Sequence, residues 1–169
     1  MARNIEIKAR VEDLARLATK VAAIADDGPT VILQDDTFFR CDSGRLKLRR
    51  FPDGSGELIF YRRANQEGPK ESFYLRSPTS APDELRESLA LAYGAVGRVK
   101  KRRTLFLVGR TRVHLDQVEA LGEFLELEVV LGDGERSENG AREAQRLMDT
   151  LGIDTSQLVE QAYVDLLGH

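Results

Sequence analysis

The chain has 169 residues, with 25 Lys and Arg against 28 Asp and Glu, so its formal net charge is −3. That length suits one domain with a substantial core and is too short to expect two, so we expect a single domain over residues 1–169. The acidic total argues against a protein whose whole surface binds nucleic acid. The single cysteine, Cys41, excludes an internal disulfide and fits a reducing compartment.

The N-terminal segment is charged and has no apolar signal core. No apolar run approaches the length of about 20 residues that a membrane-spanning helix needs. We therefore expect a cytoplasmic protein that binds neither membrane nor nucleic acid.

The first half of the chain predicts strands around one helix. Residues 4–11 alternate in polarity, which is typical of a strand, and residues 11–25 switch to helical spacing. Gly28-Pro29 is expected to end that helix. Four more strands are predicted at residues 31–40, 45–50, 57–63 and 70–76.

The second half predicts two helices and three strands. A capping box at residues 80–83 begins a helix that ends near Gly94. Another helix is expected from Ser137 to Gly152, followed by a short helical turn and an apolar tail. The strands are predicted at residues 97–108, 110–117 and 123–131.

Six of the eight predicted strands separate an apolar face from a face made almost entirely of ionisable side chains. For any one strand, a half-buried sheet with its polar face in water is the simpler interpretation. Across all six, a closed barrel explains both faces better, with apolar rows under the helices and charged rows around a hydrated tunnel. We predict an α+β fold: an eight-stranded, mainly antiparallel β-barrel with a charged interior, flanked by about three amphipathic helices.

Charge is locally uneven near the C-terminal strands. Residues 98–112 contain seven Lys and Arg and no acid, and residues 116–128 contain five acids and no base. Glu126 and Glu128 share one strand face, and like charges 4 Å apart repel by about 4 kcal/mol at an effective dielectric of 20. Such a pair binds a proton, a basic partner or a divalent metal, unless both are surface acids paired with Lys or Arg. His114 is interpreted first as a wall residue bonded to a carboxylate.

A tunnel of this kind would gather hard oxygen ligands suited to Mg²⁺ or Mn²⁺ together with more basic groups than those acids need. The acids are Glu6, Asp116, Glu126 and Glu128. The bases are Lys8, Lys47, Arg49, Arg63, Lys70, Lys101, Arg103 and Arg112. A cation site with surplus positive charge predicts a polyanion, and a triphosphate meets both requirements. Phosphoryl transfer needs this inventory of many cations and few nucleophiles.

Several motifs resemble those of the CYTH family, the triphosphate tunnel metalloenzymes. The segment Asn4-Ile5-Glu6-Ile7-Lys8 resembles its ExExK signature, and Lys47-Leu48-Arg49 and Lys101-Arg102-Arg103 resemble its later basic pairs. Residues 112–116 and 121–128 are similar to the paired segments that close the site. The likeness is greatest to bacterial class IV adenylyl cyclase-like members and runs from Asn4 to about Tyr163.

This resemblance implies residue roles. Glu6, Glu126 and Glu128 would bind the metal, with Asp116 as a further ligand, and the basic residues would bind phosphates. Asn4 stands where the family has its first glutamate, so a second metal would be held more weakly. Tyr61 or Arg62 stands where related hydrolases carry a lysine that Lys70 could replace, which makes Lys70 and Tyr61 the catalytic candidates.

Two chemistries share such a site. A class IV adenylyl cyclase-like enzyme would convert ATP to cyclic AMP and pyrophosphate, although the sequence locates no purine pocket. A triphosphatase would hydrolyse inorganic or thiamine triphosphate. A non-catalytic module that binds polyphosphate or nucleotide is a third interpretation, and the resemblance leaves room for a homodimer. Charged strand faces argue against a barrel for an apolar ligand.

Overall fold

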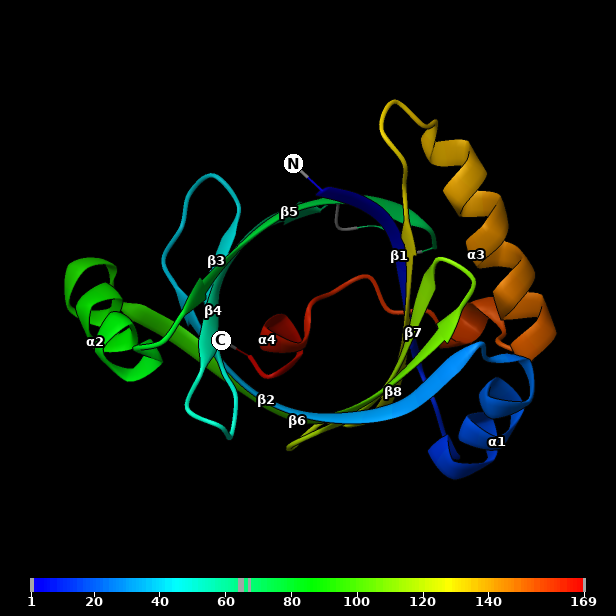
Figure 1. The fold of residues 1–169 in the computed structure, drawn as a ribbon, viewed down its shortest axis with the longest axis horizontal. Coiled ribbons are helices and arrows are strands. Elements are labelled where there is room, and N and C mark those ends of the chain that lie inside the picture. Colours follow the sequence, from blue (N-terminus) through cyan, green and yellow to red (C-terminus); the bar gives the residue numbers. More distant parts are fainter. Residues whose placement is uncertain (1, 64–65, 67, 169) are drawn as a thin grey trace.

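The structure is a computed structural model that describes residues 2–63, 66 and 68–168. Its eight strands close into a ring in the order β1-β5-β4-β3-β2-β6-β7-β8, and every neighbouring pair is antiparallel (Figure 1). The strands are β1 (Ala2–Arg10), β2 (Asp27–Phe39), β3 (Arg45–Arg50), β4 (Gly56–Arg63), β5 (Lys70–Thr79), β6 (Ala95–Val108), β7 (Thr111–Val118) and β8 (Gly122–Val130). The predicted fold class is therefore confirmed.

The helices lie outside the ring, except for a short one near the C-terminus. The outer helices are α1 (Leu14–Ile24), α2 (Pro82–Tyr93) and α3 (Ser137–Leu151). A 3₁₀ turn, η1 (Thr155–Gln157), then leads to α4 (Tyr163–Leu166), which lies within the ring when it is viewed down its axis (Figure 1). Within the described residues, no helix has the length and apolar character needed to cross a membrane.

The apolar rows of the strands face outward, as the alternation predicts. Ile7 of β1, Val113 of β7 and Leu127 of β8 are at most 1% exposed and pack in one cluster with Leu17 of α1 and Met148 of α3. On the other side of the ring, α2 packs against β2 and β3. Burial of these apolar rows is the main stabilising contribution, and it leaves the charged rows on the inside.

One prediction about the first helix is wrong. Gly28-Pro29 does not end it, because α1 ends at Ile24 and β2 begins at Asp27. The register of β2 against β6 shifts between Asp27 and Thr30, which accommodates the pair inside a strand. Gly28 has φ +106° there, and a Cβ at this position would lie 2.6 Å from a backbone oxygen of β6. Glycine is required at this point by the close approach of the two strands.

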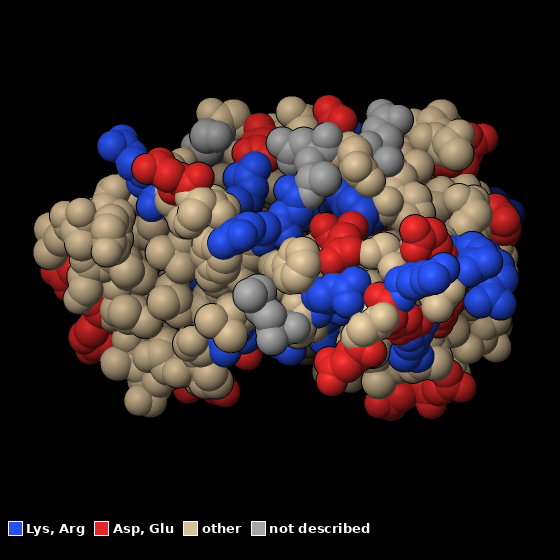
Figure 2. All heavy atoms as spheres, turned by 90° about the horizontal axis from the view of Figure 1, so that it is seen from above, with Lys and Arg blue, Asp and Glu red and all other residues tan. Residues whose placement is uncertain are grey.

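The outer surface carries paired charges near α3. Arg110 lies 2.6 Å from Glu135 and 2.8 Å from Glu143, and Figure 2 shows basic and acidic side chains intermixed at that end of the molecule. Exposed pairs of this kind contribute at most about 1 kcal/mol each. The outward charges on this face are therefore a solvated surface, in contrast to the inward rows.

Helix α3 approaches the sheet at Gly140, and this contact generates a prediction. A Cβ on Gly140 would lie 2.6 Å from Ile5 and 2.8 Å from Leu131. Gly140→Ala should gain about 1 kcal/mol of helix propensity but lose more through overpacking, typically about 1 to 3 kcal/mol. We expect net destabilisation in a urea unfolding curve. The outward-facing Arg146→Ala on the same helix serves as the control, and a more stable Gly140→Ala protein would contradict the close packing.

Candidate functional site

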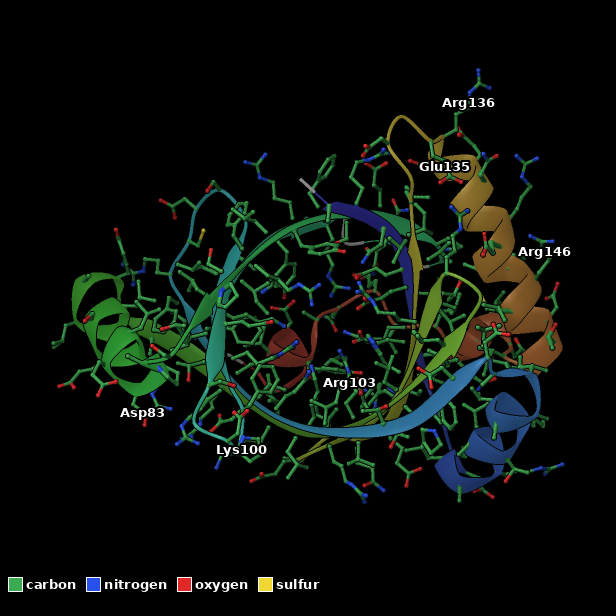
Figure 3. All side chains as sticks on the ribbon, in the orientation of Figure 1. Asp83, Lys100, Arg103, Glu135, Arg136 and Arg146 are labelled. Carbon is green, nitrogen blue, oxygen red and sulfur yellow. The ribbon has the colours of Figure 1, made fainter. Side chains whose placement is uncertain are left out.

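The inward rows of all eight strands line one cavity of about 290 Å³. Figure 3 shows Arg103 inside the ring, whereas Lys100 of the same strand points outward. Eleven of the thirteen residues predicted for the site line this cavity. They are Glu6, Lys8, Lys47, Arg49, Tyr61, Arg63, Lys101, Arg103, Arg112, Glu126 and Glu128. A larger groove of about 690 Å³ lies on the outer side of β2 and β6. The three side chains that could hold a metal ion, His114, Glu126 and Glu128, line the tunnel cavity instead.

The cavity carries a surplus of positive charge. Among the described lining residues, eight are Lys or Arg and four are Asp or Glu, so the formal surplus is four. The bases are Lys8, Lys47, Arg49, Arg63, Arg76, Lys101, Arg103 and Arg112, and the acids are Glu6, Asp36, Glu126 and Glu128. A partly enclosed, low-dielectric space with this balance attracts polyanions.

Lys70 and Asp116 are the two predicted residues that do not line the cavity. The ammonium of Lys70 donates to the backbone carbonyls of Gln66, at 3.0 Å, and Glu160, at 2.9 Å. Asp116 is fully buried and accepts both arms of the Arg103 guanidinium at 2.8 Å, together with the Tyr163 hydroxyl at 2.8 Å. Both side chains belong to inward rows, but their polar atoms are already used by backbone carbonyls, by Arg103 and by Tyr163. Their roles as catalytic lysine and further metal ligand stay predictions.

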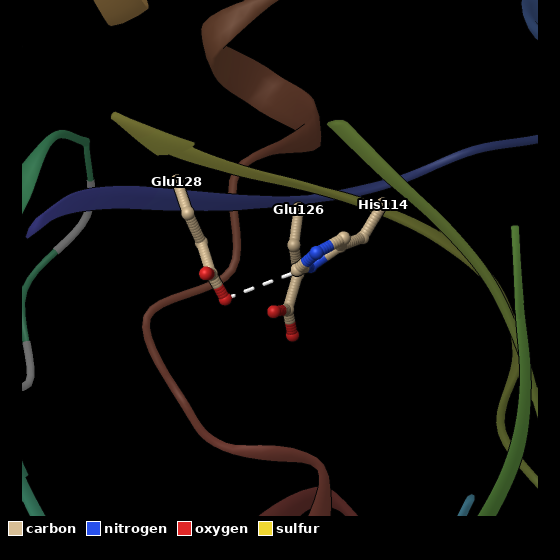
Figure 4. A group of neighbouring side chains, drawn as sticks. All are labelled: His114, Glu126 and Glu128. Carbon is tan, nitrogen blue, oxygen red and sulfur yellow. Dashed lines mark ion pairs between the residues drawn. The ribbon is translucent and has the colours of Figure 1, made fainter. Parts of the chain in front are cut away.

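A candidate metal centre lies on β7 and β8. One ligand atom each from His114, Glu126 and Glu128 lies within 4.8 Å of the others (Figure 4). The register places Glu126 directly opposite His114, and Glu128 opposite Arg112. Two carboxylates and an imidazole form a donor set that fits a divalent cation. Glu6, opposite Glu128 on β1, lines the same cavity but is paired with Arg63 at 2.9 Å.

Neighbouring cations keep the two carboxylates ionised. Burial alone would raise the pKa of Glu126, but Lys8 at 3.5 Å and Arg103 at 3.3 Å hold it well below the ordinary value. Burial also opposes ionisation of Glu128, yet its neighbours His114, Arg112 and Arg103 lower its pKa. Both side chains are therefore charged acceptors near neutral pH.

His114 lies in the wall beside Glu128, as the sequence suggested, but the expected hydrogen bond to a carboxylate is not formed within the described part of the chain. Its Nδ1 is 3.5 Å from Glu128 Oε1, which is too long for a good hydrogen bond. Burial, with a further contribution from Arg103, lowers the pKa of His114 to about 4. The ring is therefore neutral at physiological pH, with a lone pair available on one nitrogen.

Asp36 is a cavity residue that the sequence analysis missed. It is 1% exposed and accepts two hydrogen bonds from Arg49, at 2.8 and 2.9 Å. Lys47 lies 3.1 Å away and Lys101 3.8 Å away, and burial is outweighed by these cations, which leaves the pKa of Asp36 well below its ordinary value. One carboxylate thus gathers three cations, two more than it neutralises. Asp36 could have been found from its position opposite Arg49, but that position is known only once β2 is known to pair with β3.

The C-terminal segment closes one end of the tunnel. Ala162 and Tyr163 line the cavity, and Tyr163 packs edge-on against Phe124 with ring centroids 5.0 Å apart. The Lys8 ammonium donates to the Gln161 carbonyl at 3.1 Å and lies 3.9 Å from the centre of the Tyr163 ring. Burial and the nearby Arg63 lower the pKa of Lys8, to about 8, although Glu126 opposes this.

The other end of the tunnel is more exposed. Arg76 is an exposed lining residue there, and its guanidinium lies 5.5 Å from the ring of Tyr74. Arg112 donates to the Tyr74 hydroxyl at 3.4 Å. Arg76 was missed as a site residue, although it shares a strand face with Lys70 and Tyr74. Tyr61 also lines the cavity, and its burial raises the pKa of the phenol, so it is a protonated wall residue.

Comparisons with known proteins agree with this geometry. A family model described as the CYTH domain matches residues 2–163. The chain belongs to the CYTH domain family. Adenylate cyclase CyaB of Aeromonas hydrophila is 25% identical over 170 residues, which cover 95% of this chain and 86% of that protein.

Solved structures show the same CYTH tunnel fold. The PH1012 protein of Pyrococcus horikoshii OT3 superposes with a TM-score of 0.86 at 22% identity, over 96% of this chain and 98% of that one. HpAC1 of Hippeastrum, for which a dominant triphosphatase activity is described, gives a TM-score of 0.68 at 14% identity, over 99% and 94% of the two chains. At these identities the structural likeness establishes the CYTH fold.

The Asp116–Arg103 pair generates a prediction for stability. Asp116→Asn would leave Arg103 buried with only part of its compensation, a loss of about 3 to 5 kcal/mol at pH 7. Burial alone would raise the pKa of Asp116, but the charge of Arg103 outweighs burial and lowers this pKa in the folded state. The stabilisation is therefore complete above about pH 4 and is lost as the pH falls through the folded-state pKa.

We expect the difference in unfolding free energy between wild type and Asp116→Asn to narrow in acid, measured by urea unfolding from pH 7 to pH 3. The exposed Asp133→Asn is the control. A difference that stays constant over this range would show that the Asp116 charge is not the source of the stability.

Proposed function

We propose that this CYTH protein is a divalent-metal-dependent enzyme that binds a triphosphate in its tunnel. The observation that carries the proposal is the convergence of a four-charge cationic surplus and a carboxylate–imidazole cluster on one cavity. A triphosphate would use both, since its oxygens bind a metal ion on one side and basic side chains on the other. Neither feature alone would favour this class of ligand.

The basic residues form two groups that would hold different phosphates. Lys47, Arg49 and Lys101 surround Asp36 on one side of the tunnel. Lys8 and Arg103 contact Glu126 on the opposite side. The first group retains two unused positive charges, so phosphate oxygens could bind there without removal of the existing ion pairs, whereas Glu126 and Asp116 together balance Lys8 and Arg103. Planar guanidinium groups would orient the phosphates as well as neutralise them.

Glu6, Glu126 and Glu128 would hold the cation, Mg²⁺ or Mn²⁺. When bound, the ion would neutralise charge on the phosphate oxygens during transfer. Asp116 is assigned a positioning role instead of a ligand role, because its oxygens are used by Arg103 and Tyr163. Asn4 lines the same cavity but contributes no charge, so we expect one strongly held ion.

The leading reaction is class IV adenylyl cyclase-like. The ribose 3′-oxygen would attack the α-phosphorus of ATP, the bond to pyrophosphate would break, and the hydroxyl proton would pass to water. The likeness to Adenylate cyclase CyaB supports this assignment. Because α4 closes the far end, the triphosphate would lie inside with the nucleoside toward the exposed end, near Tyr74 and Arg76.

Hydrolysis of a triphosphate is the second candidate. A cavity of about 290 Å³ lies at the lower limit of pockets that bury a ligand of drug size, roughly 300 to 1,000 Å³. This favours a small substrate such as inorganic triphosphate, and HpAC1, described by its triphosphatase activity, has the same fold. In this reaction the oxygen of water would attack the terminal phosphorus, the bond from that phosphorus to the bridging oxygen would break, and orthophosphate, the diphosphate and a proton would be released. Lys70 is not assigned as a base, because its ammonium faces backbone carbonyls.

Our first functional prediction concerns Glu128. Purified protein with Mg²⁺ or Mn²⁺ should turn over ATP, inorganic triphosphate or thiamine triphosphate. Glu128→Gln should lower that rate by about 100-fold or more, because it removes a charged ligand without changing shape. Cyclic AMP and orthophosphate are measured separately, and orthophosphate without cyclic AMP would reject the cyclase. Glu119→Gln in the β7–β8 turn is the control, and equal rates in all three proteins would refute the metal assignment.

A second prediction concerns phosphate binding by β3. Arg49 faces the cavity, whereas its neighbour Arg50 pairs with Asp83 outside, at 2.9 Å. A hydrogen bond to a charged group contributes about 1.5 to 3 kcal/mol. Arg49→Gln should therefore weaken triphosphate binding by about tenfold or more, measured by calorimetry at fixed salt. Arg50→Gln should bind as wild type does, and equal weakening by both changes would indicate only a long-range charge effect.

A further inference from the structure

The imidazole of His114 presents an unused nitrogen to the candidate metal centre. The ring is buried at 5% exposure and lines the cavity. Its Nδ1 has no hydrogen-bond partner among the described residues, and Glu128 Oε1 is 3.5 Å away. A buried polar atom without a partner is costly unless something else satisfies it. This atom therefore points to a ligand of the cavity.

The spacing suits direct coordination. The donor atoms of His114, Glu126 and Glu128 lie within 4.8 Å of one another. Ligand atoms of one ion at roughly 2.1 Å lie about 3 to 4 Å apart, so rotations of the side chains would close the site. Figure 4 shows the three side chains projecting toward a common space from neighbouring strands. Antiparallel pairing of β7 and β8 fixes His114 opposite Glu126.

A positioning role alone accounts for less of the geometry. If His114 only oriented Glu128, its Nδ1–H would donate to that carboxylate at about 2.9 Å, but the atoms are 3.5 Å apart without a hydrogen bond. Glu128 instead accepts a hydrogen bond from Arg112 Nε at 3.1 Å. The carboxylate is thus already oriented, and the imidazole is left for another partner.

We propose that His114 is a nitrogen ligand which, with Glu126 and Glu128, makes this site select a divalent transition-metal ion over Mg²⁺. The inference rests on the proposed function, which places a cation at these carboxylates. Imidazole binds transition metals far better than it binds Mg²⁺, and affinity rises from Mn²⁺ to Co²⁺. A site made only of oxygen ligands would show this preference much more weakly.

The test is metal binding by the purified protein without substrate. Dissociation constants for Mg²⁺, Mn²⁺ and Co²⁺ are measured by calorimetry for wild type, His114→Gln and Glu126→Gln. His114→Gln should weaken the binding of Co²⁺ most, by about tenfold or more. It should weaken the binding of Mn²⁺ less and that of Mg²⁺ least. Pulsed EPR of the wild-type Mn²⁺ complex should detect coupling to a directly bound ¹⁴N nucleus, and His114→Gln should abolish it.

Each result separates the two proposals. Suppose that Glu126→Gln weakens the binding of all three ions. If His114→Gln then changes the affinity for none of them, or weakens all three equally without loss of a ¹⁴N signal, the nitrogen ligand is refuted and the carboxylate site stands. If Glu126→Gln weakens none, the proposed metal site itself is refuted. The outward-facing Gln117→Ala on the same strand is the control for local disturbance of β7, and circular dichroism verifies that each variant is folded.

Discussion

Charge compensation inside a closed ring is the constraint on which the rest of this structure depends. Burying ionised groups is unfavourable unless each finds a partner of opposite charge. The ring meets this condition in part by placing acids on strands beside bases, as in Arg49 with Asp36 and Arg103 with Asp116, and backbone carbonyls accept hydrogen bonds from further ammonium groups. Most of the stability comes from the apolar rows under α1 and α3, so the inner charged rows do not have to add much stability of their own. That separation leaves the interior free to serve binding.

Alternation along the strands was enough to predict the ring, because a period of two fixes which side chains share a face. It also placed Lys47 and Arg49 on the inner face, since apolar Leu48 lies between them. Lys100 to Arg103 are four consecutive basic residues, so the choice of Lys101 and Arg103 rested on the resemblance to the CYTH motif. Asp36 was missed because it follows Asp35 in the sequence. Two adjacent acids do not alternate with apolar residues, so the pattern does not show which of them faces inward. Only the pairing of β2 with β3 reveals which of the two faces Arg49.

Two further differences arise from contacts between segments distant in sequence. Lys70 has the same face parity as Ser72 and Tyr74, but it is the first residue of β5, where carbonyls from Gln66 and Glu160 hold its ammonium. Local pattern cannot predict a partner ninety residues away. The same limit applies to the C-terminal tail, whose apolar residues would suit an outer core equally well. Its return into the ring depends on contacts with Phe124 and Lys8.

The way α4 closes the tunnel preserves positive charge for binding. Lys8 and Lys70 are held by the backbone carbonyls of Gln161 and Glu160, which are neutral acceptors. A carboxylate in either place would satisfy the ammonium equally well but would cancel its charge. Tyr163 acts in the same sense, because its hydroxyl stabilises Asp116 while its ring faces the Lys8 ammonium. The C-terminal segment therefore orders the basic side chains at the closed end without neutralising them, which keeps the field of the cavity positive where the phosphates would lie.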